Sequence, residues 1–321
     1  MSAPSASERG AALATLLKLN DPPIIGLSAT PDDPMRRHTT LRLGGPADLW
    51  CVPDDPGALS ALLSRANEAN VPVSFVGGGT NLLVRDGGIR GVVVNLRRIN
   101  RVSQPQEESD PMLVAVEAGA STGRVLQFAT SRAFGGVEFL AGVPGTVGGG
   151  LIMNAGTYLG EFTDVVIEVQ SLNLRGEIIR RAHADCGFRY RDSNLPKDEL
   201  IIGALLRLRP RSLEAIERDV AKLREHRRQR EPMGVPNNGS TFKNPEGDYA
   251  GRLIEAAGLK GTRRGGAVVS DKHANWLIVD REVQPSCTSR DLIDLIEHVE
   301  GEVERAHGVR LRREVKILGE D

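Results

Sequence analysis

The sequence lacks the marks of a membrane-spanning, secreted or zinc-binding protein. No apolar run approaches the ~20 residues that a bilayer-spanning helix needs. The apolar stretch at residues 10–17 has neither a basic segment before it nor a signal-peptide cleavage pattern. The three cysteines, Cys51, Cys186 and Cys287, lie far apart and outside any CxxC pair or zinc-ligand spacing. We therefore expect a cytoplasmic protein with reduced thiols, no membrane association and no metal site.

An excess of charge of either sign is also lacking. Lys and Arg total 41 and Asp and Glu total 42, which gives a formal net charge of −1. A balanced charge provides no general attraction for nucleic acid or for an anionic membrane, so we expect neither as a partner. With 321 residues, 40% of them hydrophobic, the chain has enough apolar material for two domains.

Composition and periodicity divide the chain into a leader and two domains. Residues 1–35, rich in Ala, Ser, Pro and Asp, predict a flexible leader with at most one short helix. Short apolar strands and helices follow in residues 36–211, with subdomains at about 36–100 and 101–211. A long helix opens the C-terminal domain, residues 212–321.

A strand–helix–strand unit is predicted directly before a run of three glycines. Residues 47–52 have the apolar pattern of a strand, and Asp55 followed by Pro56 predicts the start of a helix. The helix has one apolar face and ends near Asn70. A second strand at residues 71–76 then leads into the glycines.

Cap residues and alternation predict the last two elements. Thr288 or Ser289 begins a helix, and Gly308 ends it. Residues 309–317 then alternate as a single strand, whose polar face carries Arg310, Arg312, Glu314 and Lys316. Because cations flank Glu314 on that face, we expect its carboxylate to be ionised.

The first glycine-rich segment is Val76 to Leu83. Its glycines, 77–79, let backbone N–H groups approach an anion, and Thr80 and Asn81 add side-chain donors. The segment fails as a Rossmann site, because Leu82 stands where the third glycine is needed and no acid follows about twenty residues later. A tight turn explains this segment, taken alone, about as well as a ligand does.

The second glycine-rich segment runs through residues 142–150 and 153–156. So many glycines between apolar residues are costly in backbone entropy unless the backbone passes close to something. A crowded hairpin or close helix–sheet packing is one reason, and a ligand is the other. Two such segments in one chain favour a long, doubly anionic ligand such as a dinucleotide.

A resemblance to a known family rests on six segments in the family's order: residues 38–47, 77–83, 142–156, 188–193, 239–245 and 311–315. Over about residues 36–319, the chain resembles the UDP-N-acetylenolpyruvoylglucosamine reductases. The resemblance implies an α+β protein with an FAD-binding fold of the vanillyl-alcohol-oxidase (PCMH) type and a smaller C-terminal substrate-binding domain. Residues 194–238 are too short for the family's inserted tyrosine loop, so the chain resembles the shorter form.

The resemblance also implies a reaction. With tightly but non-covalently bound FAD and NADPH as co-substrate, the family reduces the enolpyruvyl ether of UDP-N-acetylglucosamine to UDP-N-acetylmuramate for peptidoglycan. The small-molecule substrate is then the main partner, and we expect a monomer or weak homo-oligomer. Two alternatives are a flavin enzyme that oxidises an alcohol or sugar, and a sugar-nucleotide binding module without catalysis. Neither glycine-rich segment holds the His or Cys that would tether a flavin in the first alternative.

The FAD contacts that the resemblance implies lie in the two glycine-rich segments. They are Gly77, Gly78, Gly79, Thr80, Asn81, Leu82, Gly142, Pro144, Gly145, Thr146, Gly149, Asn154, Ala155 and Gly156.

The reaction requires a cation for the charge that builds on the substrate carboxylate, and a proton donor. Arg191 suits the first role, because its planar fork can hold a carboxylate at two points. By resemblance, Ser240 donates the proton. Glu314 orients it, balances charge or relays the proton. Without the resemblance, Arg191 and Glu314 would be ordinary surface residues and Ser240 part of a turn.

The substrate's diphosphate requires cations or hydrogen-bond donors. Arg230 and Asn244 match family positions that contact it, and Tyr190 would shape the pocket. The basic helix end that includes Arg230 would equally complement the helix dipole. We assign His273 no catalytic role, because a structural histidine is the commoner case.

Overall fold

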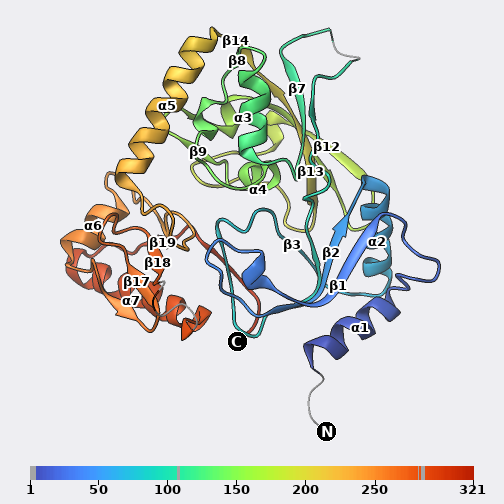
Figure 1. Ribbon diagram of the computed structural model, residues 1–321, viewed down its shortest axis with the longest axis horizontal. Helices are drawn as coiled ribbons and strands as arrows, with labels where there is room; N and C mark the ends of the chain where they lie inside the picture. The colour runs from blue at the N-terminus through green and yellow to red at the C-terminus, as the bar shows by residue number, and fades with distance from the viewer. Residues whose placement is uncertain (1–4, 107–108, 281, 283–285) are drawn as a thin grey trace. The chain divides into compact units, whose positions relative to one another are not determined.

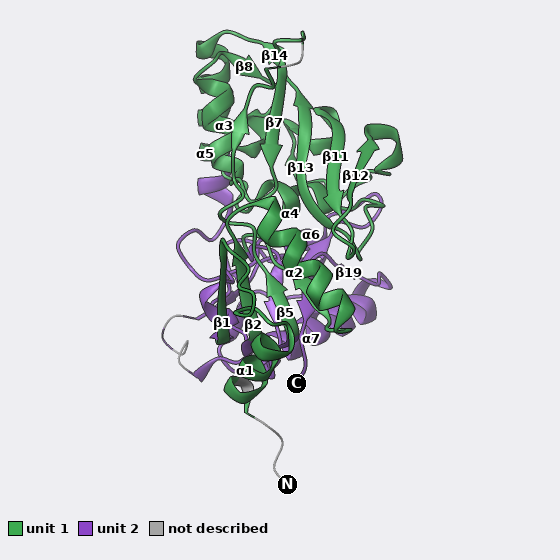
Figure 2. Ribbon diagram, turned by 90° about the vertical axis from the view of Figure 1, so that its right-hand side faces the viewer, with its two compact units in different colours: residues 1–32, 48–78, 91–225 green, residues 33–47, 79–90, 226–321 purple. Residues whose placement is uncertain are grey.

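The computed structural model describes residues 5–106, 109–280, 282 and 286–321, and these form two compact units (Figures 1 and 2). Unit 1, green in Figure 2, contains the chain up to Asp32, Asp48–Gly78 and Gly91–Glu225. Unit 2, purple, contains Asp33–Ala47, Gly79–Arg90 and His226–Asp321. Each unit has its own hydrophobic core. The predicted domain boundaries near residues 36 and 212 stay predictions.

A four-stranded sheet has the order β1-β2-β5-β3, with β3 parallel to β5. Its strands are β1 (Leu27–Pro34), β2 (Pro46–Pro53), β5 (Ile89–Val94) and β3 (Val73–Phe75). Helix α2 (Pro56–Glu68) joins β2 to β3, and Asp55 caps it by accepting a hydrogen bond from the Ala58 N–H at 2.9 Å. The predicted strand–helix–strand unit is therefore confirmed.

The leader is more ordered than the sequence predicts. Its described part contains one short helix, α1 (Ala6–Leu16), as expected, and also strand β1, which the sequence did not predict. Leu17, Leu19 and Ile24 are buried in the core of unit 1. β1 accommodates Pro31 and Pro34 because it is an edge strand, where proline removes no inner-sheet hydrogen bond. Residues 1–4 of the predicted leader lie outside the described residues.

The second sheet of unit 1 is antiparallel and has the order β12-β11-β13-β7-β6. Its strands are β12 (Ile178–Ala182), β11 (Val166–Leu172), β13 (Leu200–Arg207), β7 (Leu113–Glu117) and β6 (Val102–Ser103). The shorter elements of this unit are α3 (Thr122–Thr130), α4 (Val147–Ile152), β8 (Phe134–Gly135), β9 (Gly156–Thr157), β10 (Gly160–Glu161), β14 (Arg209–Pro210), and the 3₁₀ turns η2 (Glu138–Leu140), η3 (Phe162–Asp164) and η4 (His183–Asp185).

Unit 2 is built around a three-stranded sheet and helix α7. Its elements are η1 (Met35–Arg37), β4 (Leu82–Val84), β15 (Phe242–Lys243), α6 (Ala250–Ala256), β16 (Arg263–Arg264), β17 (Ala267–Val269), β18 (Leu277–Val279) and α7 (Ser289–His307). Thr288 caps α7, and Gly308 ends it with a φ of 67°, as predicted. The predicted long helix that opens the C-terminal part is α5 (Leu213–Arg230), which crosses from unit 1 into unit 2.

The predicted single strand at residues 309–317 is wrong. The structure has two short strands instead, β19 (Arg312–Arg313) and β20 (Lys316–Leu318). β19 pairs antiparallel with β15, whereas β20 pairs parallel with β4. The chain changes partners at Glu314 and Val315, so tertiary pairing overrides the alternating pattern. Within the described residues, no helix is both long and apolar enough to cross a membrane.

Candidate active site

The first glycine-rich segment is oriented in unit 1 by Asn95, which the sequence did not single out. The buried Asn95 amide donates to the carbonyl oxygens of Val76 and Gly77, at 2.7 and 2.9 Å. In a trans peptide the N–H points opposite to the C=O. The N–H groups of Gly77 and Gly78 therefore point away from Asn95, and both glycines are exposed.

The two glycine-rich segments meet in unit 1. A Cβ on Gly77 would lie 2.5 Å from the Thr146 hydroxyl oxygen, so any larger residue would displace the Thr146 side chain. Thr146 is the N-cap residue of α4, whose first turn belongs to the second segment. The segments are 69 residues apart in sequence (146 − 77), yet they form one surface.

Glycine occupies its positions in α4 for different reasons. A Cβ on Gly148 would lie 3.1 Å from the Ala118 Cβ, and one on Gly150 would overlap the ring of Phe162. Packing of the helix therefore explains these two. Gly149 is exposed, and the nearest atom to its Cβ position, the Thr146 hydroxyl oxygen, is 3.8 Å away. Internal packing does not require glycine there, and the predicted contact of Gly149 with FAD stays a prediction.

A tight turn at residues 189–192 attaches Arg191 to the second glycine-rich segment. The fully buried Asn154 donates to the Arg189 carbonyl at 3.2 Å, and its own oxygen accepts from the Thr163 N–H at 2.9 Å. The Arg191 guanidinium donates to the Gly156 carbonyl at 2.8 Å. Asn154 thus uses its side chain to position the turn, and its predicted contact with FAD stays a prediction.

Arg191 has an unusual backbone conformation. Its φ of 52° lies in the left-handed region, which non-glycine residues rarely adopt outside strained or functional positions. Its guanidinium carbon lies 5.3 Å from the centre of the Tyr190 ring, within the range of a cation–π contact. The side chain is half-buried, whereas Tyr190 is 49% exposed.

A second cluster lies wholly within unit 2 and joins three predicted site segments. The Asn81 amide donates to the Glu314 carbonyl at 3.0 Å, and the Asn81 carbonyl accepts from the Lys316 N–H at 3.0 Å. The Glu314 N–H donates to the Thr241 carbonyl at 2.8 Å. Asn81, Glu314 and Thr241, the residue that follows Ser240, are therefore hydrogen-bonded neighbours.

Ser240 occupies a turn that its neighbours hold in place. Gly239 has a φ of 76°, and its N–H donates to the Asn237 side-chain oxygen at 3.0 Å. Within the described part of the chain, no hydrogen bond engages the half-buried Ser240 hydroxyl. The buried side-chain atoms Asn238 Nδ2 and Thr241 Oγ1 also have no partner among the described residues. Buried polar atoms are usually hydrogen-bonded, so this turn stands out within unit 2 as a place with unused hydrogen-bonding groups.

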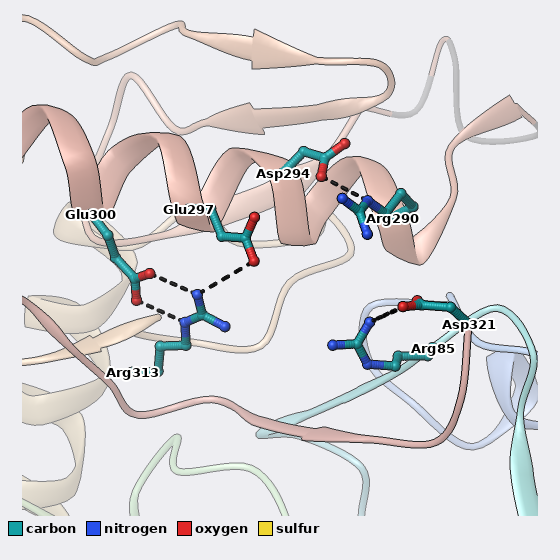
Figure 3. A network of polar contacts seen from close by, with 7 residues as sticks. All are labelled: Arg85, Arg290, Asp294, Glu297, Glu300, Arg313 and Asp321. Atoms are coloured by element: carbon teal, nitrogen blue, oxygen red, sulfur yellow. Dashed lines mark hydrogen bonds and ion pairs between the residues drawn. The ribbon is translucent and has the colours of Figure 1, made fainter.

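The segment that carries Glu314 is fixed to α7 by an ion pair (Figure 3). The Arg313 guanidinium donates to both carboxylate oxygens of Glu300, each at 2.7 Å. This bidentate pair raises the pKa of Arg313, chiefly through its hydrogen bonds to Glu300. A second pair, Arg85 with Asp321, ties the chain that follows β20 to the end of β4 (Figure 3).

Comparison with known proteins decides the family. Residues 47–181 match the FAD binding domain family, and residues 231–318 match the family described as UDP-N-acetylenolpyruvoylglucosamine reductase, C-terminal domain. UDP-N-acetylenolpyruvoylglucosamine reductases from Geobacter metallireducens and Anaeromyxobacter dehalogenans are 42% and 43% identical, each over 90% of this chain and over 94% and 85% of their own lengths. The chain belongs to the UDP-N-acetylenolpyruvoylglucosamine reductase family.

A solved structure of the same family agrees. The crystal structure of the UDP-N-acetylenolpyruvylglucosamine reductase from Thermus caldophilus has a TM-score of 0.76 and 30% identity. The match covers 91% of this chain and 99% of the Thermus chain. The predicted family, the α+β class and the FAD-binding fold with a C-terminal family domain are confirmed.

The residues predicted to bind the reductase substrate occupy exposed positions. Arg230 is the last residue of α5, and Asn244 accepts a hydrogen bond from the Ala250 N–H at 3.1 Å, where α6 begins. His273 is half-buried, and burial is the main reason that its pKa is lowered. The positive charges of Lys260 and Arg230 lower the pKa of His273 further.

Proposed function

We propose that this protein reduces UDP-N-acetylglucosamine enolpyruvate to UDP-N-acetylmuramate, with FAD as cofactor and NADPH as the electron donor, for peptidoglycan synthesis. One observation carries the proposal. Asn81, in the first glycine-rich segment, donates to the Glu314 carbonyl, and the Glu314 N–H donates to the carbonyl of Thr241, the residue after Ser240. The segments that we assign to flavin binding and to proton transfer therefore share one hydrogen-bonded cluster. We place the protein in the cytoplasm as a monomer or weak homo-oligomer.

The residues present fit FAD. The exposed Gly77, Gly78 and Gly149 offer backbone that a pyrophosphate could approach closely, and Thr146 adds a hydroxyl beside them. We assign the remaining contacts to Gly79, Thr80, Asn81 and Leu82 and to Gly142, Pro144, Gly145, Asn154, Ala155 and Gly156. When bound, FAD supplies the hydride-transfer chemistry that protein side chains lack.

Arg191 holds the substrate carboxylate in this proposal. Negative charge moves onto that carboxylate once the alkene has received a hydride and before it receives a proton. A fixed guanidinium stabilises this charge more than the charge of the ground state, which is the requirement for catalysis. The bond to the Gly156 carbonyl and the turn at residues 189–192 fix the guanidinium in advance.

Ser240 delivers the proton to the carbon next to the one that receives the hydride. A serine hydroxyl is a weak acid, so it needs a neighbour that orients it or replaces its proton. Glu314 is our candidate, because its N–H is bonded to Thr241, the residue after Ser240. Tyr190, Arg230 and Asn244 are our candidates for binding the rest of the substrate, including its diphosphate.

The test is to mix the purified, FAD-loaded protein with NADPH and UDP-N-acetylglucosamine enolpyruvate. The proposal expects NADPH oxidation that depends on this substrate and yields UDP-N-acetylmuramate in equal amount. A protein that binds FAD but consumes no NADPH in response to the substrate would refute it. Oxidation of a free alcohol or sugar in the same assay would instead indicate a different flavin enzyme.

A further inference from the structure

Asn275 is a buried residue whose side-chain amide and backbone carbonyl both bond the segment next to Ser240. It is 3% exposed. Its side-chain oxygen accepts from the Phe242 N–H at 3.0 Å, and its side-chain nitrogen donates to the Phe242 carbonyl at 2.8 Å. Its own carbonyl accepts from the Thr241 N–H at 2.8 Å. One asparagine thus replaces a neighbouring strand along one edge of β15.

The opposite side of the same segment holds Glu314. The Thr241 carbonyl accepts hydrogen bonds from the N–H groups of Glu314 and Val315, at 2.8 and 3.3 Å. β15 and β19 continue this pairing, with Phe242 opposite Arg313. Thr241 and Phe242 are therefore fixed between Asn275 on one side and the Glu314 segment on the other, directly after Ser240.

Asn275 is itself held firmly. Its N–H donates to His273 Nδ1 at 3.2 Å, and its neighbours Ala274 and Trp276 are buried. The Trp276 N–H donates to the His273 carbonyl at 2.9 Å, which closes a turn around Asn275. The amide therefore has a fixed position from which to orient β15.

We propose that Asn275 is a positioning residue for proton transfer, which sets Ser240 in register with Glu314. This inference rests on the proposed function. Asn275 need not touch substrate, because its amide is engaged by Phe242 on both its oxygen and its nitrogen. If the amide is lost, β15 loses one edge and the turn that carries Ser240 loses its fixed distance to the carbon that must be protonated.

A positioning role and a purely structural role predict different kinetics. A purely structural defect lowers flavin content, thermal stability and every rate together. A positioning defect leaves flavin reduction by NADPH unchanged and slows the step that follows, in which the reduced flavin is reoxidised by the enolpyruvyl substrate. A displacement of the proton donor by about 1 Å reduces the rate of such a step by about 10²-fold.

The experiment compares Asn275→Ala and Asn275→Asp with the unchanged protein, each loaded with FAD. The matched control is Asn173→Ala, because Asn173 also organises a loop through its side chain, accepting from the Arg175 and Glu177 N–H groups, and is not bonded to the Ser240 or Glu314 segments. Stopped-flow absorbance measures flavin reduction and reoxidation separately. Melting temperature and flavin content are measured on the same samples.

Asn275→Ala should reduce flavin at the original rate but reoxidise it about tenfold to 100-fold more slowly. Asn275→Asp keeps the acceptor for Phe242 and loses the donor. Its reoxidation rate should recover as the pH falls, because the protonated carboxyl regains a donor. Asn173→Ala should change neither rate.

Three outcomes would overturn the inference. The first is reoxidation at the original rate in a folded Asn275→Ala protein. The second is an equal loss of rate in both half-reactions. The third applies if neither variant folds: fast hydrogen exchange at the Phe242 N–H of the unchanged protein refutes the inference, whereas slow exchange supports it. If the unchanged protein reoxidises no flavin with the enolpyruvyl substrate, the proposed function fails instead.

Discussion

At the scale of single residues, three adjacent positions are occupied by glycine for different physical reasons. Gly148 and Gly150 lie against Ala118 and Phe162, whereas Gly149 faces outward. The sequence indicated that this run approaches something closely, but it gave no means to separate packing from a ligand. Only the neighbours of each Cβ position do so, and they divide the run into glycines that packing requires and one, Gly149, that packing does not require.

Gly150→Ala should therefore affect stability, whereas Gly149→Ala should affect FAD binding. Gly150→Ala forces a Cβ into the Phe162 ring and should lower the free energy of unfolding by about 1–3 kcal/mol. Gly149→Ala should leave stability unchanged or slightly raised, because alanine favours a helix, and should weaken FAD binding by about tenfold, or 1.4 kcal/mol. Urea unfolding of the apoprotein and FAD titration measure the two. Equal loss of stability in both variants would contradict this division.

Ser240→Ala tests the assigned proton donor. The variant should fold, bind FAD and reduce it with NADPH, because within the described part of the chain no hydrogen bond depends on this hydroxyl. Product formation should fall by about 10²-fold or more, the usual contribution of a positioned acid. Rapid-quench analysis of UDP-N-acetylmuramate measures it. Loss of flavin reduction as well would show that Ser240 serves another purpose.

At the scale of elements, the sequence predicted the features that neighbouring residues determine and did not predict the pairing of strands distant in sequence. The caps at Asp55, Thr288 and Gly308 were predicted, because each acts on its own helix end. The division of residues 309–317 into β19 and β20 was missed, since it depends on β15 and β4, which are distant in sequence. Asn95 and Asn275 were also missed, because an asparagine that bonds a distant backbone has no sequence pattern of its own.

The Arg313–Glu300 pair is the element-scale contact that fixes the Glu314 segment to α7. The Arg313 side chain is 32% exposed and its guanidinium binds Glu300 at two points, so Arg313→Ala should lower the free energy of unfolding by about 1 kcal/mol. Arg290→Ala is the control, because its pair with Asp294 on α7 is more exposed, and it should cost less than about 0.5 kcal/mol (Figure 3). Urea unfolding measures both. Equal effects of the two substitutions would mean that the β19–α7 ion pair adds no more stability than the exposed pair within α7.

At the scale of the whole molecule, the predicted site residues divide between the two units. Arg191 belongs to unit 1, whereas Ser240 and Glu314 belong to unit 2. The first glycine-rich segment itself crosses from one unit to the other between Gly78 and Gly79. Periodicity and spacing could not relate these residues, because nothing local connects them. The resemblance to the family did relate them, because it compares the order of the segments over almost the whole chain.

The stability of the whole molecule should depend on pH through His273. Burial, followed by the charges of Lys260 and Arg230, lowers the pKa of His273 below its ordinary value of 6.5. As the pH falls below 6.5, the unfolded chain takes up a proton at this residue and the folded chain does not. The unfolded state then binds more protons, so the free energy of unfolding decreases with falling pH until the lowered pKa is reached.

His273→Gln should remove this part of the pH dependence. Glutamine does not titrate, so the loss of stability between pH 8 and pH values below about 6.5 should be smaller in the variant than in the unchanged protein. Urea unfolding across this range measures the difference, and His298→Gln on α7 serves as the comparison. The same slope in His273→Gln and in the unchanged protein would mean that His273 titrates alike in both states. His273 Nδ1 can accept the Asn275 N–H only while it carries no proton, so such a result would also mean that this hydrogen bond does not hold the ring neutral in the folded state.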